Sequence, residues 1–480
     1  MAHFLLNDQI VSLDQVTADT TVLDLVREQH ELWGTKEGCA SGDCGACTVT
    51  VVDEKNGKLV YESANSCIML AGALKGKQLI TVDHLKENQR LHPVQQSLVD
   101  HHASQCGFCT PGFVMSLFTL YKNGPTDSHQ NTTALVHENL AGNLCRCTGY
   151  RPIVDAANSV LGKIETDQFD DREGHTLSVL ESLKASENSQ QPGFLIPDSI
   201  SQLIQDLENH PDARLLAGGT DLVLEVTQQL KSLHKVILLK NVKELSEVME
   251  TTEQITIGAA VSLNQCYDIL KDHYPSMAEM LHRFGSKQVR NQGTIGGNIA
   301  NASPIGDLPP VLITLGAQLN LQDKDNIRTI EIEDFFLDYR KTDLRPGEFI
   351  RSIVIPKLRA DQHFRVYKVS KRLDDDISAV CIAIKLHKNA DSEAIESVRI
   401  AFGGMAAIPK RAGQCESVLM NEGLTGTAIE NAINALQADF DPISDARASA
   451  QYRIQVAGNL LKRFVLDIES DHDLLQVGDI

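Results

Sequence analysis

The sequence lacks a long hydrophobic run, a secretory leader and an excess of positive charge. No stretch approaches the roughly 18 consecutive apolar residues of a transmembrane helix. The opening Met-Ala-His-Phe-Leu-Leu has neither the basic nor the apolar region of a signal peptide. A formal charge of −20 would repel nucleic acid and anionic membranes. We therefore expect a cytoplasmic protein whose partners are proteins or small molecules, not nucleic acid or a membrane.

The cysteines are unevenly distributed along the 480 residues, a length that suggests about three or four domains. The composition, 42% hydrophobic and 22% charged, is that of a folded protein with large cores. Eight of the eleven cysteines lie before position 148. Because structural disulfides are rare in a reducing compartment, this clustering indicates metal or redox chemistry. The isolated Cys266, Cys381 and Cys415 are expected to be buried small hydrophobes.

The first cysteine group lies between a predicted helix and a predicted strand. The apolar pattern predicts a hairpin over residues 3–13, a helix from Thr20 to Leu32 and a strand at Thr48–Val52. A single loop supplies three cysteines, and a fourth follows the next segment: Cys39, Cys44, Cys47 and Cys67. This C-x4-C-x2-C spacing with a distant fourth cysteine is typical of plant-type [2Fe–2S] ferredoxins.

The glycines of this loop suit an iron–sulfur site. Gly38, Gly42 and Gly45 allow a tight fold in which backbone N–H groups point at the sulfurs. The alternatives are a structural zinc site or free thiols. Zinc knuckles usually pair C-x2-C units, whereas here one loop carries three cysteines with interleaved glycines, which favours a [2Fe–2S] cluster.

The second cysteine group is predicted to lie at helix ends. Helices are predicted at Pro93–His102, Pro111–Tyr121, from Thr132 or Thr133 to Leu140, and Ile153–Leu161. Two helical hairpins that face each other would bring four thiolates together: Cys106, Cys109, Cys145 and Cys147. From the residues alone, a zinc site made of the same four cysteines stays open beside a second [2Fe–2S] cluster.

A polar, acidic stretch at 166–192 is expected to be an exposed linker with one short helix, followed by a new domain. The first motif beyond it is an apolar strand with a Gly218-Gly219 turn, after which Thr220 or Asp221 could cap a helix. Such a turn offers backbone N–H groups to a diphosphate, although it is more often only a tight turn. The Rossmann pattern G-x-G-x-x-G is absent from the chain.

A second glycine-rich stretch, from Gly293 to Asp307, brings three glycines close to Thr294, Asn298 and Ser303. This composition suits a backbone that wraps a phosphate or a ribose. Two such loops about 75 residues apart could hold opposite sides of one cofactor.

Taken together, these motifs resemble those of the molybdenum hydroxylases, the xanthine dehydrogenase and aldehyde oxidase family. The resemblance rests on Q-C-G-F-C-T-P-G at 105–112, N-L-C-R-C-T-G-Y-R-P at 143–152 and the two glycine-rich loops, and it extends to I-A-F-G-G-M-A-A-I-P-K-R-A at 400–412. It implies an α+β multidomain fold: a β-grasp plant-type ferredoxin domain at 1–83, an α-helical [2Fe–2S] domain at 84–165, a linker at 166–192, an α+β non-Rossmann FAD-binding domain at 193–360 and an α+β C-terminal flavoprotein domain at 361–466.

The resemblance also implies site residues. The eight clustered cysteines would bind two [2Fe–2S] clusters. Ile350 and Lys368 would contact FAD, although Ile350 stands where leucine is frequent in the family. The other FAD contacts implied are Leu215, Leu216, Ala217, Gly218, Gly219, Thr220, Asp221, Leu222, Phe284, Thr294, Ile295, Gly296, Gly297, Asn298 and Asp307. No residue of this chain is expected to act as a catalytic acid or base. The charged loop Lys371–Asp376 would either influence the flavin or be a solvated charge run.

Within the family, the domain order matches the small subunit of a bacterial two-subunit xanthine dehydrogenase. The resemblance then implies a role in purine catabolism with a large partner subunit that carries the molybdenum cofactor and oxidises hypoxanthine and xanthine to uric acid. Electrons would pass through the two clusters to FAD and then to NAD+, in a dimer of heterodimers. Two alternatives stay open. The chain could serve a molybdenum hydroxylase for an aldehyde, an N-heterocycle or an aromatic thioester, or it could be a stand-alone NADH-linked carrier.

Overall fold

The computed structural model describes residues 2–124, 132–185, 193–389 and 394–469. The chain forms two compact units. Unit 1 comprises Met1–Asp198, Asp212–Asn241 and Ser286–Gly293, and unit 2 comprises Ser199–Pro211, Val242–Gly285 and Thr294–Ile480. Each unit is therefore assembled from separate stretches of the chain.

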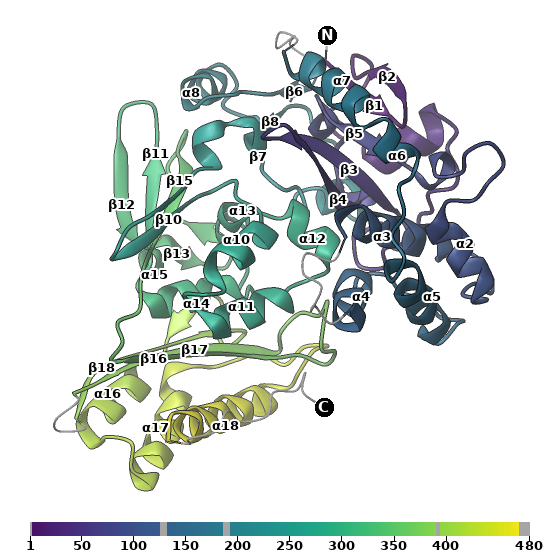
Figure 1. Cartoon of the computed structure of the whole chain (residues 1–480). Coiled ribbons are helices and arrows are strands. Elements are labelled where there is room, and N and C mark those ends of the chain that lie inside the picture. Colours follow the sequence, from purple (N-terminus) through teal and green to yellow (C-terminus); the bar gives the residue numbers. More distant parts are fainter. Residues whose placement is uncertain (1, 125–131, 186–192, 390–393, 470–480) are drawn as a thin grey trace. The chain divides into compact units, whose positions relative to one another are not determined.

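Unit 1 begins with a five-stranded mixed sheet in the order β2-β1-β5-β3-β4 (Figure 1). Its strands are β1 (His3–Leu6), β2 (Gln9–Ser12), β3 (Thr48–Lys55), β4 (Lys58–Asn65) and β5 (Gln78–Ile80). β1 and β2 form the predicted hairpin, while β1 pairs in parallel with β5. The predicted helix is shorter than expected: α1 (Val22–Asp24) runs into a π-helical turn that ends at Gln29, and Glu31 then adopts a φ of +55°, which a continuing helix cannot accommodate.

Helices follow the sheet at the predicted positions. They are α2 (Pro93–Asp100), α3 (Thr110–Asn123), α4 (Thr132–Leu140) and α5 (Arg151–Leu161). Pro111 lies in the first turn of α3, and Gly124 ends the helix with a φ of +63°. The helix start and stop residues thus act as the sequence predicted. Phe113, Phe118 and Ile153 are buried in the core between the helices.

The predicted linker contains two helices, α6 (Gln168–Asp171) and α7 (Glu173–Ala185), where one short helix was expected. α7 packs on β1, β3 and β4. Leu180 and Leu183 are buried beside Leu5, and Lys184 forms an ion pair with Asp53 at 2.8 Å. This part of the segment is therefore docked on the first sheet, while 186–192 lie outside the described residues.

A three-stranded parallel sheet completes unit 1. Its order is β6 (Phe194–Leu195), β8 (Val236–Leu238) and β7 (Arg214–Leu216). Phe194 and Leu216 share one hydrophobic core with Cys47 and Cys67. The start of the predicted FAD-binding domain is thus part of the same physical unit as the first cysteine group.

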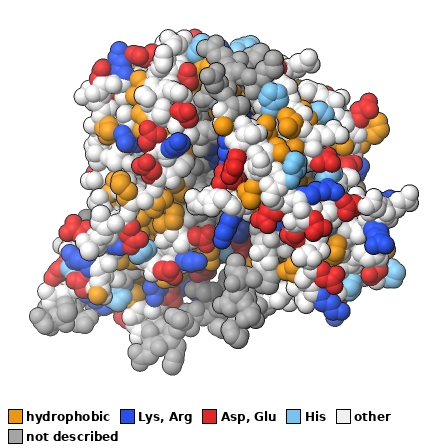
Figure 2. All heavy atoms as spheres, turned by 45° about the horizontal axis from the view of Figure 1, so that its top comes forward, with side chains coloured by type: hydrophobic (Ala, Val, Ile, Leu, Met, Phe, Trp, Pro, Cys, Tyr) orange, Lys and Arg blue, Asp and Glu red, His pale blue; other side chains and the backbone are white. Residues whose placement is uncertain are grey.

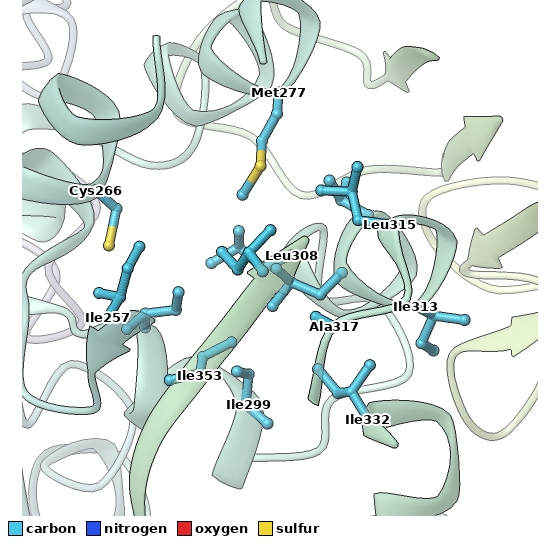
Figure 3. Close-up of a cluster of buried hydrophobic side chains, with 14 of the residues drawn as sticks. Ile257, Cys266, Met277, Ile299, Leu308, Ile313, Leu315, Ala317, Ile332 and Ile353 are labelled. Carbon is cyan, nitrogen blue, oxygen red and sulfur yellow. The ribbon is translucent and has the colours of Figure 1, made fainter. Parts of the chain in front are cut away.

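Unit 2 is built on a five-stranded antiparallel sheet in the order β12-β11-β15-β10-β9. The strands are β9 (Val248–Glu250), β10 (Gln254–Gly258), β11 (Gln318–Gln322), β12 (Ile327–Glu331) and β15 (Phe349–Pro356); the other elements are α8 (Ile200–Asn209), α10 (Leu263–Leu270), α11 (Pro275–His282), α13 (Ile295–Ala300), α14 (Leu308–Leu315), α15 (Ile332–Phe335), β13 (Phe336–Asp338) and β14 (Lys341–Thr342). Figure 3 shows the core, in which Ile353 of β15 lies among Ile257, Ile299 and Leu308.

The C-terminal part of unit 2 is a four-stranded antiparallel sheet covered by helices. It comprises β16 (Gln362–Val369), β17 (Val380–Lys388), β18 (Ile395–Gly403), β19 (Lys410–Arg411), α16 (Gly413–Glu422), α17 (Gly426–Asp439) and α18 (Ala450–Glu469). α14 packs on β17 and β18, which joins the two sheets of unit 2. Buried Arg453 of α18 donates to the carbonyl of Gly404 at 2.9 Å and to Asp445 at 2.8 Å.

The α+β multidomain fold predicted from the sequence is confirmed. Acidic and basic side chains are interspersed over the surface shown in Figure 2. In the described ranges, we find no helix with the length and apolar character that a membrane crossing requires.

Candidate cofactor sites

The first four cysteines lie together in unit 1. The Cys39 thiol contacts the thiols of Cys44 and Cys67, and the Cys67 thiol also contacts that of Cys47. These contacts with Cys44 and Cys67 hold the pKa of Cys39 well below its usual range. The backbone N–H of Ser41 donates to Cys39 Sγ at 3.4 Å, as expected for a loop whose amides face sulfur.

The loop glycines have distinct roles. Gly42 and Gly45 have φ values of +82° and +66°, a backbone region that glycine adopts without strain. Gly38 is needed for space, because a Cβ there would lie 2.7 Å from Cys44 Sγ. Asn65 Nδ2 donates to the Gly42 carbonyl at 2.7 Å, which fixes the loop to the end of β4.

The second cysteine group occupies helix ends, as predicted. Cys109 directly precedes α3, and the C-x-C pair precedes α5. The thiols contact in pairs, Cys106 with Cys147 and Cys109 with Cys145. The Thr148 hydroxyl donates to Cys145 Sγ at 3.1 Å and its N–H at 3.4 Å. Thus both groups have sulfur atoms that accept hydrogen bonds from the loops carrying them.

The two cysteine groups differ in how exposed they are. Cys47 and Cys67 are buried, whereas Cys106 and Cys147 are exposed. Across the described residues, no three or more His, Cys, Asp or Glu side chains are arranged as a site for a metal ion. The cysteines instead associate through the pairwise contacts given above. The isolated Cys266, Cys381 and Cys415 are buried as predicted, and burial raises the pKa of Cys266 to about 12.

A backbone hydrogen bond connects the two cysteine loops. The N–H of Leu144, the residue before Cys145, donates to the carbonyl oxygen of Cys44 at 3.0 Å. Nearby, Asn143 Nδ2 donates to the Gly45 carbonyl at 3.1 Å. The loops that carry the two cysteine groups are therefore in direct contact within unit 1.

The first glycine loop follows β7 and lies against the first cysteine group. A Cβ at Gly219, whose φ is +79°, would lie 3.5 Å from the carbonyl oxygen of Ile68, the residue after Cys67. Gln228 Nε2, just beyond the loop, donates to the carbonyls of Cys39 and Ala40 at 3.3 and 2.9 Å. These contacts hold the loop beside the first cysteine group.

The helix after this loop starts later than predicted. α9 (Leu224–Thr227) begins beyond Val223, so Thr220 and Asp221 do not cap it. The reason is that Gly219 has a positive φ and its carbonyl accepts from the Val223 N–H at 2.9 Å, which adds a turn first. Within the described part of the chain, the N–H groups of Gly218, Gly219 and Thr220 have no protein acceptor.

The second glycine loop, in unit 2, forms the start of α13. Thr294 caps this helix, since its hydroxyl accepts from the Gly297 N–H at 3.1 Å. Gly296 allows close approach to the residue after β10, because a Cβ there would lie 2.5 Å from Ala259 Cβ. Ile295 is buried in the core, while the side-chain oxygen of Asn298 is buried and has no partner among the described residues.

The remaining predicted FAD contacts also lie in unit 2. Buried Asp307 accepts from Lys368 Nζ at 2.6 Å through one oxygen, and its other oxygen has no partner among the described residues. Lys368 Nζ also donates to the Asp376 carbonyl and to Ser378 Oγ, both at 2.9 Å, so its three donors are used. Ile350 is buried in β15, and Phe284 is half-buried against the same core.

The charged loop after β16 is held by hydrogen bonds, although Lys371 and Arg372 at its start are exposed. Asp376 accepts from the Arg372 N–H at 2.8 Å. Arg283, the neighbour of Phe284, donates to the carbonyls of Leu373 at 3.0 Å and Lys368 at 3.3 Å. The loop is thereby tied to the residue before the predicted flavin aromatic.

Sequence reasoning missed several polar residues that the fold brings to these sites. Gln228 and Gln288 donate to the loops of the first cysteine group or to residues beside them. Gln292, just before the second glycine loop, has a buried amide with no partner among the described residues. A lone glutamine carries no spacing signal, so only the fold could identify these residues.

Comparisons with known proteins support four domains. Residues 4–72 match a 2Fe-2S iron-sulfur cluster binding domain, and residues 81–158 match a [2Fe-2S] binding domain. Residues 187–358 match the FAD binding domain in molybdopterin dehydrogenase, and residues 365–468 match the CO dehydrogenase flavoprotein C-terminal domain.

Two relatives illustrate the similarity in sequence. Xanthine dehydrogenase from Emericella nidulans is 32% identical over 531 residues, which cover 98% of this chain and 38% of that protein. Xanthine dehydrogenase/oxidase from Rattus norvegicus is 31% identical, with 84% of this chain and 34% of that protein covered. The chain thus spans less than two-fifths of either relative.

Solved structures are similar to somewhat more than half of the chain. The reconstituted CO dehydrogenase from Oligotropha carboxidovorans has a TM-score of 0.54 and 27% identity, over 58% of this chain and 98% of that chain. Quinoline 2-oxidoreductase from Pseudomonas putida 86 has a TM-score of 0.53 and 25% identity, with the same coverage. The four domain matches, in their order along the chain, indicate that the chain belongs to the molybdenum hydroxylase family. It corresponds to the iron–sulfur and flavin region of such an enzyme.

Proposed function

We propose that this chain carries electrons from a molybdenum-containing partner through two [2Fe–2S] clusters to FAD and then to NAD+, as part of a xanthine dehydrogenase. Cys39, Cys44, Cys47 and Cys67 hold one cluster, and Cys106, Cys109, Cys145 and Cys147 hold the other. The observation that carries the proposal is the hydrogen bond from the Leu144 N–H to the Cys44 carbonyl, because it connects the two cysteine loops directly.

The first cysteine group also contacts the first glycine loop. Gly219 lies against Ile68, and Cys67 shares a hydrophobic core with Leu216 at the start of that loop. Unit 1 therefore has a continuous series of contacts from the Cys145 loop to the Cys44 loop, and from Cys67 to the glycine loop. Such an arrangement suits cofactors that exchange electrons in sequence.

The exposed side of the second cysteine group supports the docking of a partner. Cys106 and Cys147 are exposed, and so are the large hydrophobic residues Phe108, Leu144 and Tyr150 of the same loops. Exposed hydrophobic side chains beside a redox site mark a surface for protein contact. We place the entry of electrons, and the molybdenum-containing subunit, on this side.

The predicted FAD contacts fit a flavin. The N–H groups of Gly218, Gly219 and Thr220 are free to donate to phosphate oxygens. In unit 2, an unpartnered oxygen on each of Asn298 and Asp307 could accept from cofactor hydroxyls. Lys368 orients the Asp307 carboxylate, because its ammonium group donates to one of the two carboxylate oxygens.

Each cofactor would supply chemistry that side chains lack, since iron–sulfur clusters transfer single electrons whereas a flavin collects two and passes them on as a hydride. The protein holds these cofactors in order and tunes them. Hydrogen bonds to sulfur, such as those from Ser41 and Thr148, stabilise negative charge on the cysteines. No acid or base on this chain is required at the purine.

The choice of xanthine as substrate rests on the relatives named xanthine dehydrogenase. The similarity to CO dehydrogenase and quinoline 2-oxidoreductase favours a second candidate, an equivalent role beside a partner with another substrate. The substrate would be bound by the partner in both cases.

The test is to purify the chain with whatever binds it and to count iron, flavin and molybdenum. Xanthine, an aldehyde, quinoline and CO are then added separately without oxygen, and NADH is added in another sample. We expect xanthine to bleach the iron–sulfur and flavin absorbance. If both stay oxidised in a molybdenum-replete complex, the xanthine assignment is wrong, and bleaching by another substrate identifies the second candidate. Reduction by NADH in a preparation without any molybdenum-containing chain would favour a stand-alone carrier.

A further inference from the structure

A buried set of four polar side chains lies between the two cysteine loops. We call it the Gln288 network; it comprises Thr48, Ser116, Asn143 and Gln288, all at most 2% exposed. Gln288 Nε2 lies 3.1 Å from Ser116 Oγ, 3.1 Å from Asn143 Oδ1 and 3.3 Å from Thr48 Oγ1. The two N–H bonds of one amide thus serve three acceptors.

Two members of the network adjoin the cysteines. Thr48 follows Cys47, and its hydroxyl donates to the Gly45 carbonyl at 2.7 Å. Asn143 stands two residues before Cys145, and its Nδ2 donates to the same Gly45 carbonyl at 3.1 Å. Gln288 therefore bonds to residues on both cysteine loops at once.

Gln288 itself comes from the third stretch of chain that makes up unit 1. This segment is α12 (Lys287–Gln292), which lies beside α4 in Figure 1. Lys287 forms an ion pair with Glu138 of α4 at 3.0 Å. Asn291 Nδ2 donates to the Ser63 carbonyl of β4 at 3.0 Å. The Gln288 amide is thus presented from a fixed position.

The network is not the arrangement that stability alone would favour. Gln288 Oε1 is buried with no partner among the described residues, and leaving a buried acceptor unpaired is destabilising. An apolar side chain of the same length would avoid this cost. An apolar side chain, however, could not donate hydrogen bonds to both cysteine loops and so hold one loop against the other.

We infer that Gln288 is a positioning residue that sets the spacing between the two [2Fe–2S] clusters. The inference rests on the proposed function, because it requires a cluster on each cysteine group. Spacing matters because electron transfer between two centres slows steeply as they move apart. The α12 segment would therefore determine how fast electrons cross unit 1, although it contributes no ligand.

The test compares the full chain, with its co-purified partner, as wild type, Gln288→Met and Asn291→Leu. Methionine keeps the length of glutamine and removes its donors. Asn291→Leu is the matched control, since it removes another buried amide of α12, one that donates to Ser63 of β4. The readout is the magnetic interaction between the two reduced clusters in electron paramagnetic resonance, taken from line splitting or from the enhanced spin relaxation of one cluster by the other.

We expect Gln288→Met to retain its iron and the signal of each cluster but to shift their interaction, and Asn291→Leu to leave the interaction unchanged. An equal interaction in all three proteins overturns the inference and leaves the proposed function intact. Iron counts or spectra without two [2Fe–2S] clusters in the wild type overturn the proposed function itself. If Gln288→Met does not fold, Ser116→Ala removes one acceptor of the network, and an unchanged interaction in that variant overturns the inference equally.

Discussion

Gly112 of α3 lies directly against Gly45 of the first cysteine loop. A Cβ added at Gly112 would be 2.1 Å from the Gly45 carbonyl oxygen, far inside van der Waals contact. Gly45 is equally confined, since a Cβ there would lie 2.4 Å from the Gly142 carbonyl oxygen. The two cysteine loops therefore meet backbone to backbone, at a place where only glycine fits.

Replacing Gly112 by alanine should force these backbones apart. The methyl group overpacks the contact, which typically costs about 1–3 kcal/mol. Urea unfolding followed by the visible iron–sulfur absorbance should show a lower midpoint. The control is Gly174→Ala in α7, where a Cβ meets nothing within 4 Å. Equal urea midpoints for the two variants would contradict this prediction. They would mean that α3 can move away from the Gly45 backbone without loss of stability.

The buried Asp167 should make unit 1 sensitive to acid. Burial by itself would raise the pKa of Asp167, but hydrogen bonds from His92 and Lys122 outweigh burial and hold that pKa well below its usual range. A carboxyl group with a depressed pKa in the folded state contributes its full stabilisation at pH values above its pKa in the unfolded chain, about 3.9. This stabilisation is lost as the pH falls below that value. The melting temperature should therefore drop more steeply below about pH 4 than above it.

Asp167→Asn tests this assignment because it removes the titrating group and leaves its shape. The variant should be less stable at neutral pH, by about 3 kcal/mol for a broken buried ion pair. The difference in the free energy of unfolding between variant and wild type should then become smaller as the pH falls. Asp155→Asn, at an exposed position of α5, serves as the control and should keep the wild-type pH profile. A gap that stays constant down to about pH 3 contradicts the role of Asp167.

Cys147→Ser should remove the second cluster and interrupt the proposed path. We expect a loss of about two iron atoms per chain and no reduction of the flavin by xanthine. Direct reduction of the flavin by NADH should survive, because Cys147 lies at the far end of the proposed order. Cys415→Ala, at a buried cysteine remote from both groups in sequence, should keep full iron. Failure of NADH reduction in a folded variant that retains FAD would show that the order of cofactors is wrong.

Asp307→Ala should weaken FAD binding without loss of iron. The change removes the unpartnered oxygen and leaves Lys368 without its buried carboxylate partner. We expect the Kd for FAD to rise at least about tenfold, which corresponds to about 1.4 kcal/mol. Flavin and iron per chain, measured after gel filtration, provide the check. Asp268→Asn on the exposed face of α10 is the control. An unchanged flavin content would exclude Asp307 from the site.

The grouping of the cysteines followed from local sequence patterns more directly than the contacts predicted for the flavin. Three cysteines in one short loop, with Gly42 and Gly45 between them, form a local pattern whose chemistry follows from spacing. The helix boundaries at Pro111 and Gly124 are local in the same way, and the structure confirms them. Local signals of this kind depend on the neighbouring residues alone.

What the sequence did not reveal depends on contacts between distant segments. The docking of α7 on the first sheet depends on Lys184 meeting Asp53, 131 positions earlier in the chain. The delayed start of α9 depends on the positive φ of Gly219. Gln288 becomes significant only because the fold brings it to Asn143. None of these relations leaves a periodic pattern in the sequence.

The three-part composition of unit 1 also has a consequence for biosynthesis. Cys147, the last of the clustered cysteines, is made 141 residues before Gln288. At about 5–20 residues per second, the ribosome needs roughly 7–28 s to cover that distance. During this interval all eight cysteines exist without the helix that locks their loops together. If the two proposed clusters are inserted during synthesis, this interval is the period in which the nascent chain still lacks α12.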